Sequence, residues 1–158
     1  MHSRFLIGAA GAAVLLCTGT AALAQAPTWN KEQTEVWSVV SKSWDDEVAQ
    51  NGKWPNDYVD ERVVSWGDDW PAPRYRASLE SWTRFADKQG KTLKFDLSPL
   101  AITVSGDTAV AHYSVVMVTQ KGTEKTEREV SGNVETLVRT GGKWRFLSLA
   151  GFGLSPGK

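Results

Sequence analysis

The chain has 158 residues with 18 basic and 18 acidic side chains, so its formal net charge is zero. A neutral chain offers no basic surface for DNA or RNA, and we therefore expect no nucleic-acid partner. The length suits a single domain with a sizeable core.

The first 26 residues have the anatomy of a secretory signal peptide. Arg4 precedes an apolar run at residues 5–16, which is too short and too interrupted by glycine to span a bilayer comfortably. Residues 24–26 then supply an Ala-Gln-Ala cleavage site. We expect residues 1–26 to be removed and residues 27–158 to form one domain, secreted or periplasmic, with no membrane span after cleavage.

An uncleaved anchor and a lipoprotein modified at Cys17 are the alternatives. The residue before a lipidated cysteine is normally small, and Leu16 is large, which favours a cleaved signal. Cleavage removes Arg4, His2 and Cys17, which leaves 17 basic and 18 acidic side chains, His112 as the one histidine, and no cysteine. We therefore expect an exported domain without disulfides.

The sequence also argues against a metal ion or a bound cofactor. Zinc normally takes three or four His, Cys or carboxylate ligands, and only carboxylates accompany His112. Asp68 and Asp69, in a predicted loop, are too few for a hard cation, which takes six or more oxygens. The Gly-Gly-Lys at residues 141–143 lacks the rest of a phosphate-binding loop.

Apolar residues recur at helical spacing after Trp29. They form one stripe: Val36, Trp37, Val40, Trp44 and Val48. Gly52 and Pro55 end this helix. We predict a short middle helix in the next piece, residues 56–73, and a third helix at residues 74–88 that ends at Gly90.

Beyond Gly90 the apolar period changes to two, which predicts strands. Apolar residues alternate at 93, 95 and 97 and then, beyond Pro99, at 100, 102 and 104. Longer strands are predicted at residues 108–120, 127–139 and 144–152. Helices followed by a meander of strands predict an α+β fold, with three N-terminal helices packed on a curved, mainly antiparallel sheet.

Three segments carry a family resemblance: GDTAV at residues 106–110, GKWR at 142–145 and VVSWG at 63–67. With this order of elements the chain resembles the nuclear transport factor 2-like superfamily, in particular its SnoaL-like and DUF4440-type branch. The resemblance implies a cone whose open end holds a pocket. Members include isomerases, cyclases, dehydratases and proteins without chemistry, so the fold alone does not give the reaction.

The chain departs from that branch at two polar positions. DUF4440-type relatives often place a histidine just after the Trp-Arg of the last strand, where residues 147–152 contain none, and an arginine where Asn133 stands. Their polar site residues are therefore not transferred to this chain.

We expect Trp37, Tyr58, Trp66 and His112 to bind a ligand in the cone. Trp37, Trp44, Trp66 and Trp82 at helical spacing are either core or an aromatic wall of the pocket. His112 alternates with Tyr113 along its strand, whose two faces are both largely apolar. It lines the pocket near Trp37 or Trp66 if the cone interior takes the His112 face, where it would contact a ligand or act as a catalytic base. Otherwise it lies on the outer face of the sheet as a structural or interface residue.

Three functions remain open at this stage. The first is an exported domain that binds a small, largely apolar molecule without catalysis. The second is a ketosteroid-isomerase-like or SnoaL-like isomerase, dehydratase or cyclase that uses Asp or Tyr acid–base chemistry, with Asp57, Asp60, Asp68 and Asp69 as candidate acids. The third is an assembly module that forms a homodimer through the sheet.

Overall fold

The structure is a computed structural model that describes residues 28–68, 70–121 and 125–154. The predicted signal peptide, residues 1–26, lies outside the described residues, and so does Asp69. Signal cleavage therefore stays a prediction.

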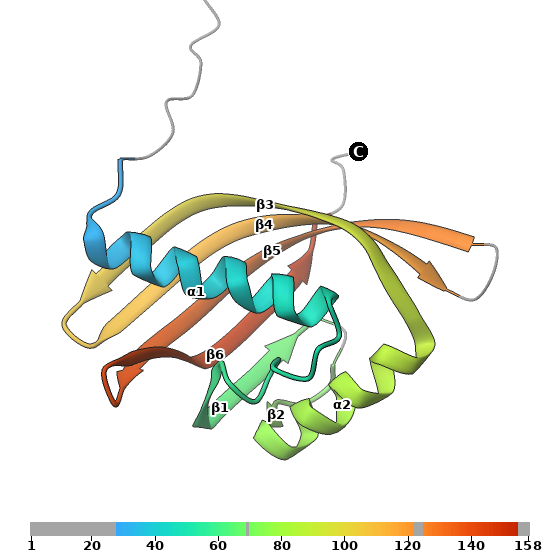
Figure 1. Cartoon of the computed structure of the whole chain (residues 1–158), viewed down its shortest axis with the longest axis horizontal. Helices are drawn as coiled ribbons and strands as arrows, with labels where there is room; N and C mark the ends of the chain where they lie inside the picture. Colours follow the sequence, from blue (N-terminus) through green and yellow to red (C-terminus); the bar gives the residue numbers. More distant parts are fainter. Residues whose placement is uncertain (1–27, 69, 122–124, 155–158) are drawn as a thin grey trace, which may run out of the picture.

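The first predicted helix is present as α1, Lys31–Val48. Asn30 caps it: its side chain accepts a hydrogen bond from the Gln33 backbone, and the Gln33 side chain accepts one from the Asn30 backbone. Val36 and Val40 lie on the buried side of this helix. Figure 1 shows α1 lying across one face of the curved sheet, which is the face that holds the core.

The predicted middle helix is wrong, because this segment forms strand β1, Val59–Gly67. It pairs in parallel with strand β6, Lys143–Gly153, which lies some 80 residues further along the chain. Periodicity within a short window does not report such a distant partner, whereas the β-branched Val63 and Val64 suit the sheet. The described part of the structure thus has two helices and not the predicted three, and the second helix follows the strands β1 and β2.

The third predicted helix is present as α2, Arg76–Gln89. It starts two residues later than predicted, because Arg74–Tyr75 forms the short strand β2 and pairs with Ser65 and Val64 of β1. In Figure 1, α2 lies beside β1 and β2 and leads into the long strands.

The remaining strands are β3, Gly90–Ser105; β4, Thr108–Lys121; and β5, Lys125–Thr140. The sheet order is β2-β1-β6-β5-β4-β3, and every pair except β1–β6 is antiparallel. Gly141 and Gly142, both at positive φ, form the two-residue connection between β5 and β6 that such tight hairpins favour. The predicted α+β class and the mainly antiparallel sheet are confirmed.

Residues 93–104 form one continuous strand within β3, although the apolar alternation changes phase at Pro99. The pairing with β4 shifts between Pro99 and Ala101, and Leu100, at the shift, is 66% exposed. The irregularity lets apolar side chains on both sides of it face α1. Before the shift Leu97 pairs with Val115, and after the shift Ile102 pairs with Ala111.

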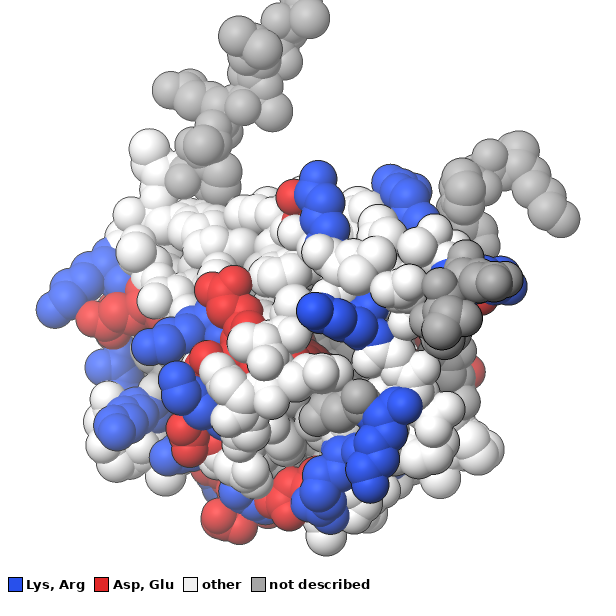
Figure 2. Space-filling view, turned by 45° about the vertical axis from the view of Figure 1, so that its right-hand side comes forward, with Lys and Arg blue, Asp and Glu red and all other residues white. Residues whose placement is uncertain are grey.

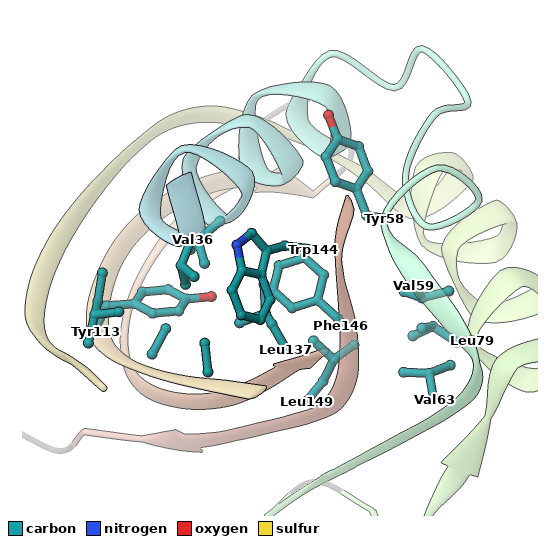
Figure 3. Packing of buried hydrophobic residues seen from close by; sticks show 14 residues of the cluster. Val36, Tyr58, Val59, Val63, Leu79, Tyr113, Leu137, Trp144, Phe146 and Leu149 are labelled. Carbon is teal, nitrogen blue, oxygen red and sulfur yellow. The ribbon is translucent and has the colours of Figure 1, made fainter. Parts of the chain in front are cut away.

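The core lies between the helices and the sheet. Its largest fully buried side chains are Tyr113, Phe146, Leu137, Val36, Val40, Val59 and Val63. Figure 3 shows the Tyr113 hydroxyl pointing into the space that α1 and the sheet enclose, with Leu79 of α2 beside Val59 and Val63.

Charged side chains of both signs are interspersed over the face that Figure 2 shows. Such mixing gives no large single-sign field on this face. Among the described residues, neither helix is long and apolar enough to cross a bilayer.

Candidate functional site

A chain of two hydrogen bonds links α1 to the middle of the sheet. Trp44 Nε1 donates to the Tyr113 hydroxyl at 2.9 Å, and this hydroxyl donates to Oε1 of Glu135 at 2.8 Å. Tyr113 and Glu135 come from the neighbouring strands β4 and β5, on the face that α1 covers. The rings of Trp37 and Tyr113 pack edge to face with their centroids 5.8 Å apart, which holds Tyr113 in place.

Glu135 is a buried carboxyl group, with 7% of its surface exposed. Burial raises the pKa of Glu135 to about 8, because the charged form loses its hydration; the Tyr113 hydrogen bond opposes this rise, and the negative charge of Glu47 adds to it. At neutral pH Glu135 is therefore mostly protonated. Burial also raises the pKa of Tyr113, which keeps its hydroxyl proton.

The donors in this chain determine where the Glu135 proton lies. An indole N–H is a donor only, so the Tyr113 oxygen accepts from Trp44 and its single proton goes to Glu135 Oε1. The acid proton of Glu135 therefore lies on Oε2. This atom is buried, and within the described part of the chain it has no hydrogen-bond partner.

Glu135 lines a cavity of about 240 Å³ between the helices and the sheet, here called the inner cavity. Its wall contains the three rings of Trp44, Trp54 and Trp82. The other lining residues are Ser43, Glu47, Ser65, Arg74, Leu79, Thr83 and Leu149. The wall therefore combines aromatic and apolar side chains with several polar and charged ones, and such converging polar groups orient a ligand in a small-molecule site.

A second cavity, here called the outer cavity, has a volume of about 650 Å³. It is lined by the C-terminal ends of β1 and β6, the start of β5, and Trp70. Ser65, Arg74, Glu135 and Leu149 line both cavities. These four residues therefore mark the place where the two cavities meet.

Two of the four predicted ligand-binding residues lie in or under α1. Trp37 packs against Tyr113 and Trp29 and is part of the core boundary, not of the inner cavity. The Tyr58 hydroxyl donates a hydrogen bond to Asp46 Oδ2 of α1. Tyr58 thus anchors the chain below α1 and borders a separate surface groove that also contains Trp144.

The other two predicted residues lie elsewhere. Trp66 is 58% exposed, lines the outer cavity and donates from Nε1 to the Trp70 carbonyl at 3.0 Å. His112 neighbours Tyr113 on β4, so it points to the sheet face opposite α1. It lies half-buried between Ala101 and Val134 of the adjacent strands. The structure therefore does not bring the four residues together.

Of the predicted tryptophan wall, Trp44 and Trp82 line the inner cavity, together with Trp54. Trp54 was not part of the predicted wall. Trp37 and Trp66 do not line it.

The candidate aspartates lie outside the inner cavity. Asp57 and Asp68 are exposed, and Asp69 is not among the described residues. Asp60 is buried but accepts hydrogen bonds from Arg62 and Thr140, and the Arg62 bond is the main cause that lowers the Asp60 pKa to about 2. None of the three described aspartates lines the inner cavity.

Glu135, the acid that lines the inner cavity, was not among the predicted site residues. It alternates with Val134 and Thr136 along its strand and shares its face with Leu137. The same face also carries the polar Ser131 and Asn133 and the charged Arg139, so the local pattern gives no signal that distinguishes Glu135. In the described ranges, no three His, Cys, Asp or Glu side chains come together as a metal site.

Comparison with known proteins agrees with this geometry at the level of the fold. A family model described as "SnoaL-like domain" matches residues 50–151. No curated protein matches the chain significantly.

Solved structures with the same fold are similar over nearly the whole described chain. A ketosteroid isomerase-like protein from Erwinia carotovora atroseptica aligns with a TM-score of 0.71 and 12% identity, covering 81% of this chain and 100% of that one. A conserved protein from Planctomyces limnophilus gives 0.72 and 9%, with 78% and 96% covered. An NTF2-like protein with a cystatin-like fold from Novosphingobium aromaticivorans gives 0.63 and 19%, with 80% and 84% covered.

Proposed function

Since the chain belongs to the SnoaL-like family of the nuclear transport factor 2-like superfamily, we propose that its inner cavity binds a small, largely apolar molecule that carries an oxygen acceptor. The observation that carries the proposal is the protonated, buried Glu135, whose Oε2–H lacks a partner among the described residues. An unpaired buried donor is costly, and a ligand carbonyl oxygen would satisfy it once a rotation of the carboxyl group turns Oε2 toward the inner cavity.

The shape and lining of the inner cavity limit the ligand. Its volume of about 240 Å³ is below the roughly 300–1,000 Å³ usual for ligand pockets, so it suits a compact molecule. The three tryptophan rings favour a flat, apolar body. A cyclic or aryl ketone combines such a body with a strong acceptor.

The test compares 1-tetralone with tetralin, a hydrocarbon of nearly the same shape. We expect 1-tetralone to quench tryptophan fluorescence at lower concentration than tetralin and to raise the melting temperature, since a ligand at 100 times its Kd adds about 2.7 kcal/mol. Glu135→Leu removes the donor and should abolish the preference for the ketone. Glu129→Leu, a change on the outer cavity alone, is the matched control.

Absence of any fluorescence or melting change with either compound would contradict the proposal. Equal binding of the two compounds would contradict the assigned role of Glu135 and leave a purely apolar site.

A second candidate function is acid–base catalysis, as in an isomerase, dehydratase or cyclase. It is favoured by two carboxyl groups on one cavity, the protonated Glu135 and Glu47, whose negative charge raises the Glu135 pKa. A neutral acid that donates to a carbonyl oxygen and a carboxylate that accepts a proton from the adjacent carbon together promote enolisation. The aspartates of the sequence hypothesis would then be replaced by these glutamates.

Deuterium exchange at C2 of 1-tetralone, followed by NMR in D₂O, tests this second candidate. Catalysis predicts exchange well above the buffer rate, and Glu47→Gln should return the rate to that of buffer. If 1-tetralone binds but its deuterium exchange is no faster than in buffer, the protein binds the ketone without catalysing its enolisation.

Export and homodimer formation through the sheet are further proposals of ours. Export predicts that the protein recovered from a periplasmic or culture fraction has the mass of residues 27–158. Dimer formation through the outer sheet face, where His112 lies, predicts a sedimentation coefficient of a dimer at micromolar concentration.

A further inference from the structure

We infer that the ligand carries a carboxylate and that Arg74 binds it where the inner and outer cavities meet. The inference rests on the proposed binding function and names the class of ligand: a compact, flat molecule with a neutral oxygen acceptor at one end and an anionic group at the other.

The position of Arg74 is the first reason. It lies on β2, paired with Ser65 of β1, and both residues line the two cavities. A ligand that fills the inner cavity and reaches toward the outer one therefore passes this side chain. Glu135 lines both cavities as well, so Arg74 and Glu135 both belong to the wall that the two cavities share.

The surroundings of the guanidinium are the second reason. The Arg74 Cζ lies 3.1 Å from the ring centroid of Trp70 and 5.2 Å from that of Trp82. Trp70 and Trp82 also pack against each other edge to face, with centroids 4.9 Å apart. Stacking on aromatic rings uses the flat face of the guanidinium, whereas its N–H groups lie in its plane, where a carboxylate binds in a bidentate way.

The distribution of charge is the third reason. Of the described residues that line the inner cavity, Arg74 is the one with a positive charge. Glu47 brings a negative charge to the same cavity and disfavours an anion beside it, whereas the protonated Glu135 is neutral. The anionic end of a ligand is therefore expected at Arg74, and the neutral end at Glu135.

The test uses four defined probes in two matched pairs: 4-acetylbenzoate with 4-acetylbenzamide, and 4-acetylphenylacetate with its primary amide. Each pair keeps the ketone and the ring and changes only the charge, and the two pairs differ in the reach of the charged group. Titration calorimetry at pH 6.5 keeps the benzoate ionised and Glu135 mostly protonated.

We expect the wild-type protein to bind at least one acid about tenfold more tightly than its amide, and this preference to weaken as salt is added. Arg74→Met keeps an unbranched side chain beside Trp70 and should remove the preference. Arg128→Met, which lines the outer cavity but not the inner one, should keep it. If Arg74→Met does not fold, Arg74→Lys keeps the charge without the bidentate geometry and should reduce the preference severalfold.

Several results would overturn the inference. One is that the wild-type protein binds the acid and the amide of both pairs with equal affinity. Another is that the wild-type protein binds 1-tetralone but none of the four probes. If the preference for the acid persists in Arg74→Met and disappears in Arg128→Met, the carboxylate binds at Arg128 in the outer cavity and not at Arg74. Failure of 1-tetralone itself to bind would instead remove the proposed function, on which the inference rests.

Discussion

The Tyr113 hydroxyl donates a 2.8 Å hydrogen bond to Oε1 of Glu135 in the interior of the molecule. A carboxyl group there is stable as an acid, since its ionised form would lack hydration and would face the negative charge of Glu47. The stability of the fold therefore depends on the protonation state of Glu135.

Glu135 should make the protein less stable as the pH rises. Its pKa is about 8 in the folded state and near the ordinary 4.5 in the unfolded state, so the folded state binds more protons between these values. The stabilisation is complete below pH 4.5 and is lost as the pH rises through about 8. The difference corresponds to roughly 5 kcal/mol at most.

Urea unfolding of the wild-type protein and Glu135→Gln at pH 5, 6.5 and 8 measures this effect. We expect the free energy of unfolding to fall over this range in the wild-type protein relative to the variant. Comparing the two cancels the contribution of other titrating groups. Parallel pH profiles would show that Glu135 does not titrate in this range.

Tyr113→Phe should destabilise the fold by about 1–3 kcal/mol, because Trp44 Nε1 and Glu135 Oε1 both lose their partner. The pKa of Glu135 should also rise, since the Tyr113 hydrogen bond holds it down. Urea unfolding and a carbon-13 NMR titration of the Glu135 carboxyl group measure the two effects. Tyr75, which is 65% exposed, gives the control Tyr75→Phe, with a change within about 0.5 kcal/mol.

Asp60→Asn should destabilise the protein at neutral pH by about 1–3 kcal/mol. Asp60 Oδ1 accepts from Arg62 Nε at 2.8 Å and Oδ2 from the Thr140 hydroxyl at 2.9 Å, which ties β1 to the end of β5. Because the Asp60 pKa is lowered to about 2, its stabilisation is present above pH 3.8 and is lost as the pH falls through about 2.

Unfolding free energies at pH 7 and pH 3 measure the loss for Asp60→Asn. The exposed Lys94–Asp96 pair gives the control, and Asp96→Asn should change stability by less than about 1 kcal/mol. Equal effects of the two substitutions would mean that the buried bonds of Asp60 contribute no more than a surface ion pair.

Gly67→Ala should destabilise the protein more than Gly132→Ala, although atoms of neighbouring residues lie close to both glycines. A Cβ at Gly67 would lie 2.7 Å from the backbone oxygen of Gly151, and the paired strands would have to separate. A Cβ at Gly132 would lie 2.6 Å from the Phe152 ring, which is 45% exposed and free to rotate away. Thermal unfolding should show a loss of about 1–3 kcal/mol for Gly67→Ala and a smaller one for Gly132→Ala.

Much of the fold is predictable from the sequence, because it depends on local patterns. The stripe with Val36 and Val40 predicts α1, and the alternation after Gly90 predicts the long strands. The error at residues 59–67 has a physical cause: the partner of β1 is β6, and a pairing between distant segments leaves no local period.

The site was less predictable, because the strand that carries Tyr113 is apolar on both faces. Only the packing of α1, through Trp37 and Trp44, selects the Tyr113 face as the interior. That choice also turns Glu135 inward through its pairing with Ala111 and turns His112 outward.

The two irregularities of β3, between Thr92 and Lys94 and between Pro99 and Ala101, affect how copies of the protein meet in concentrated solution. β3 is an edge strand of the sheet, and a long flat edge recruits strands from other molecules into aggregates. Here the shifts and the missing N–H of Pro99 divide that edge into short pieces that match a foreign strand poorly. Such breaks oppose strand-by-strand aggregation along β3.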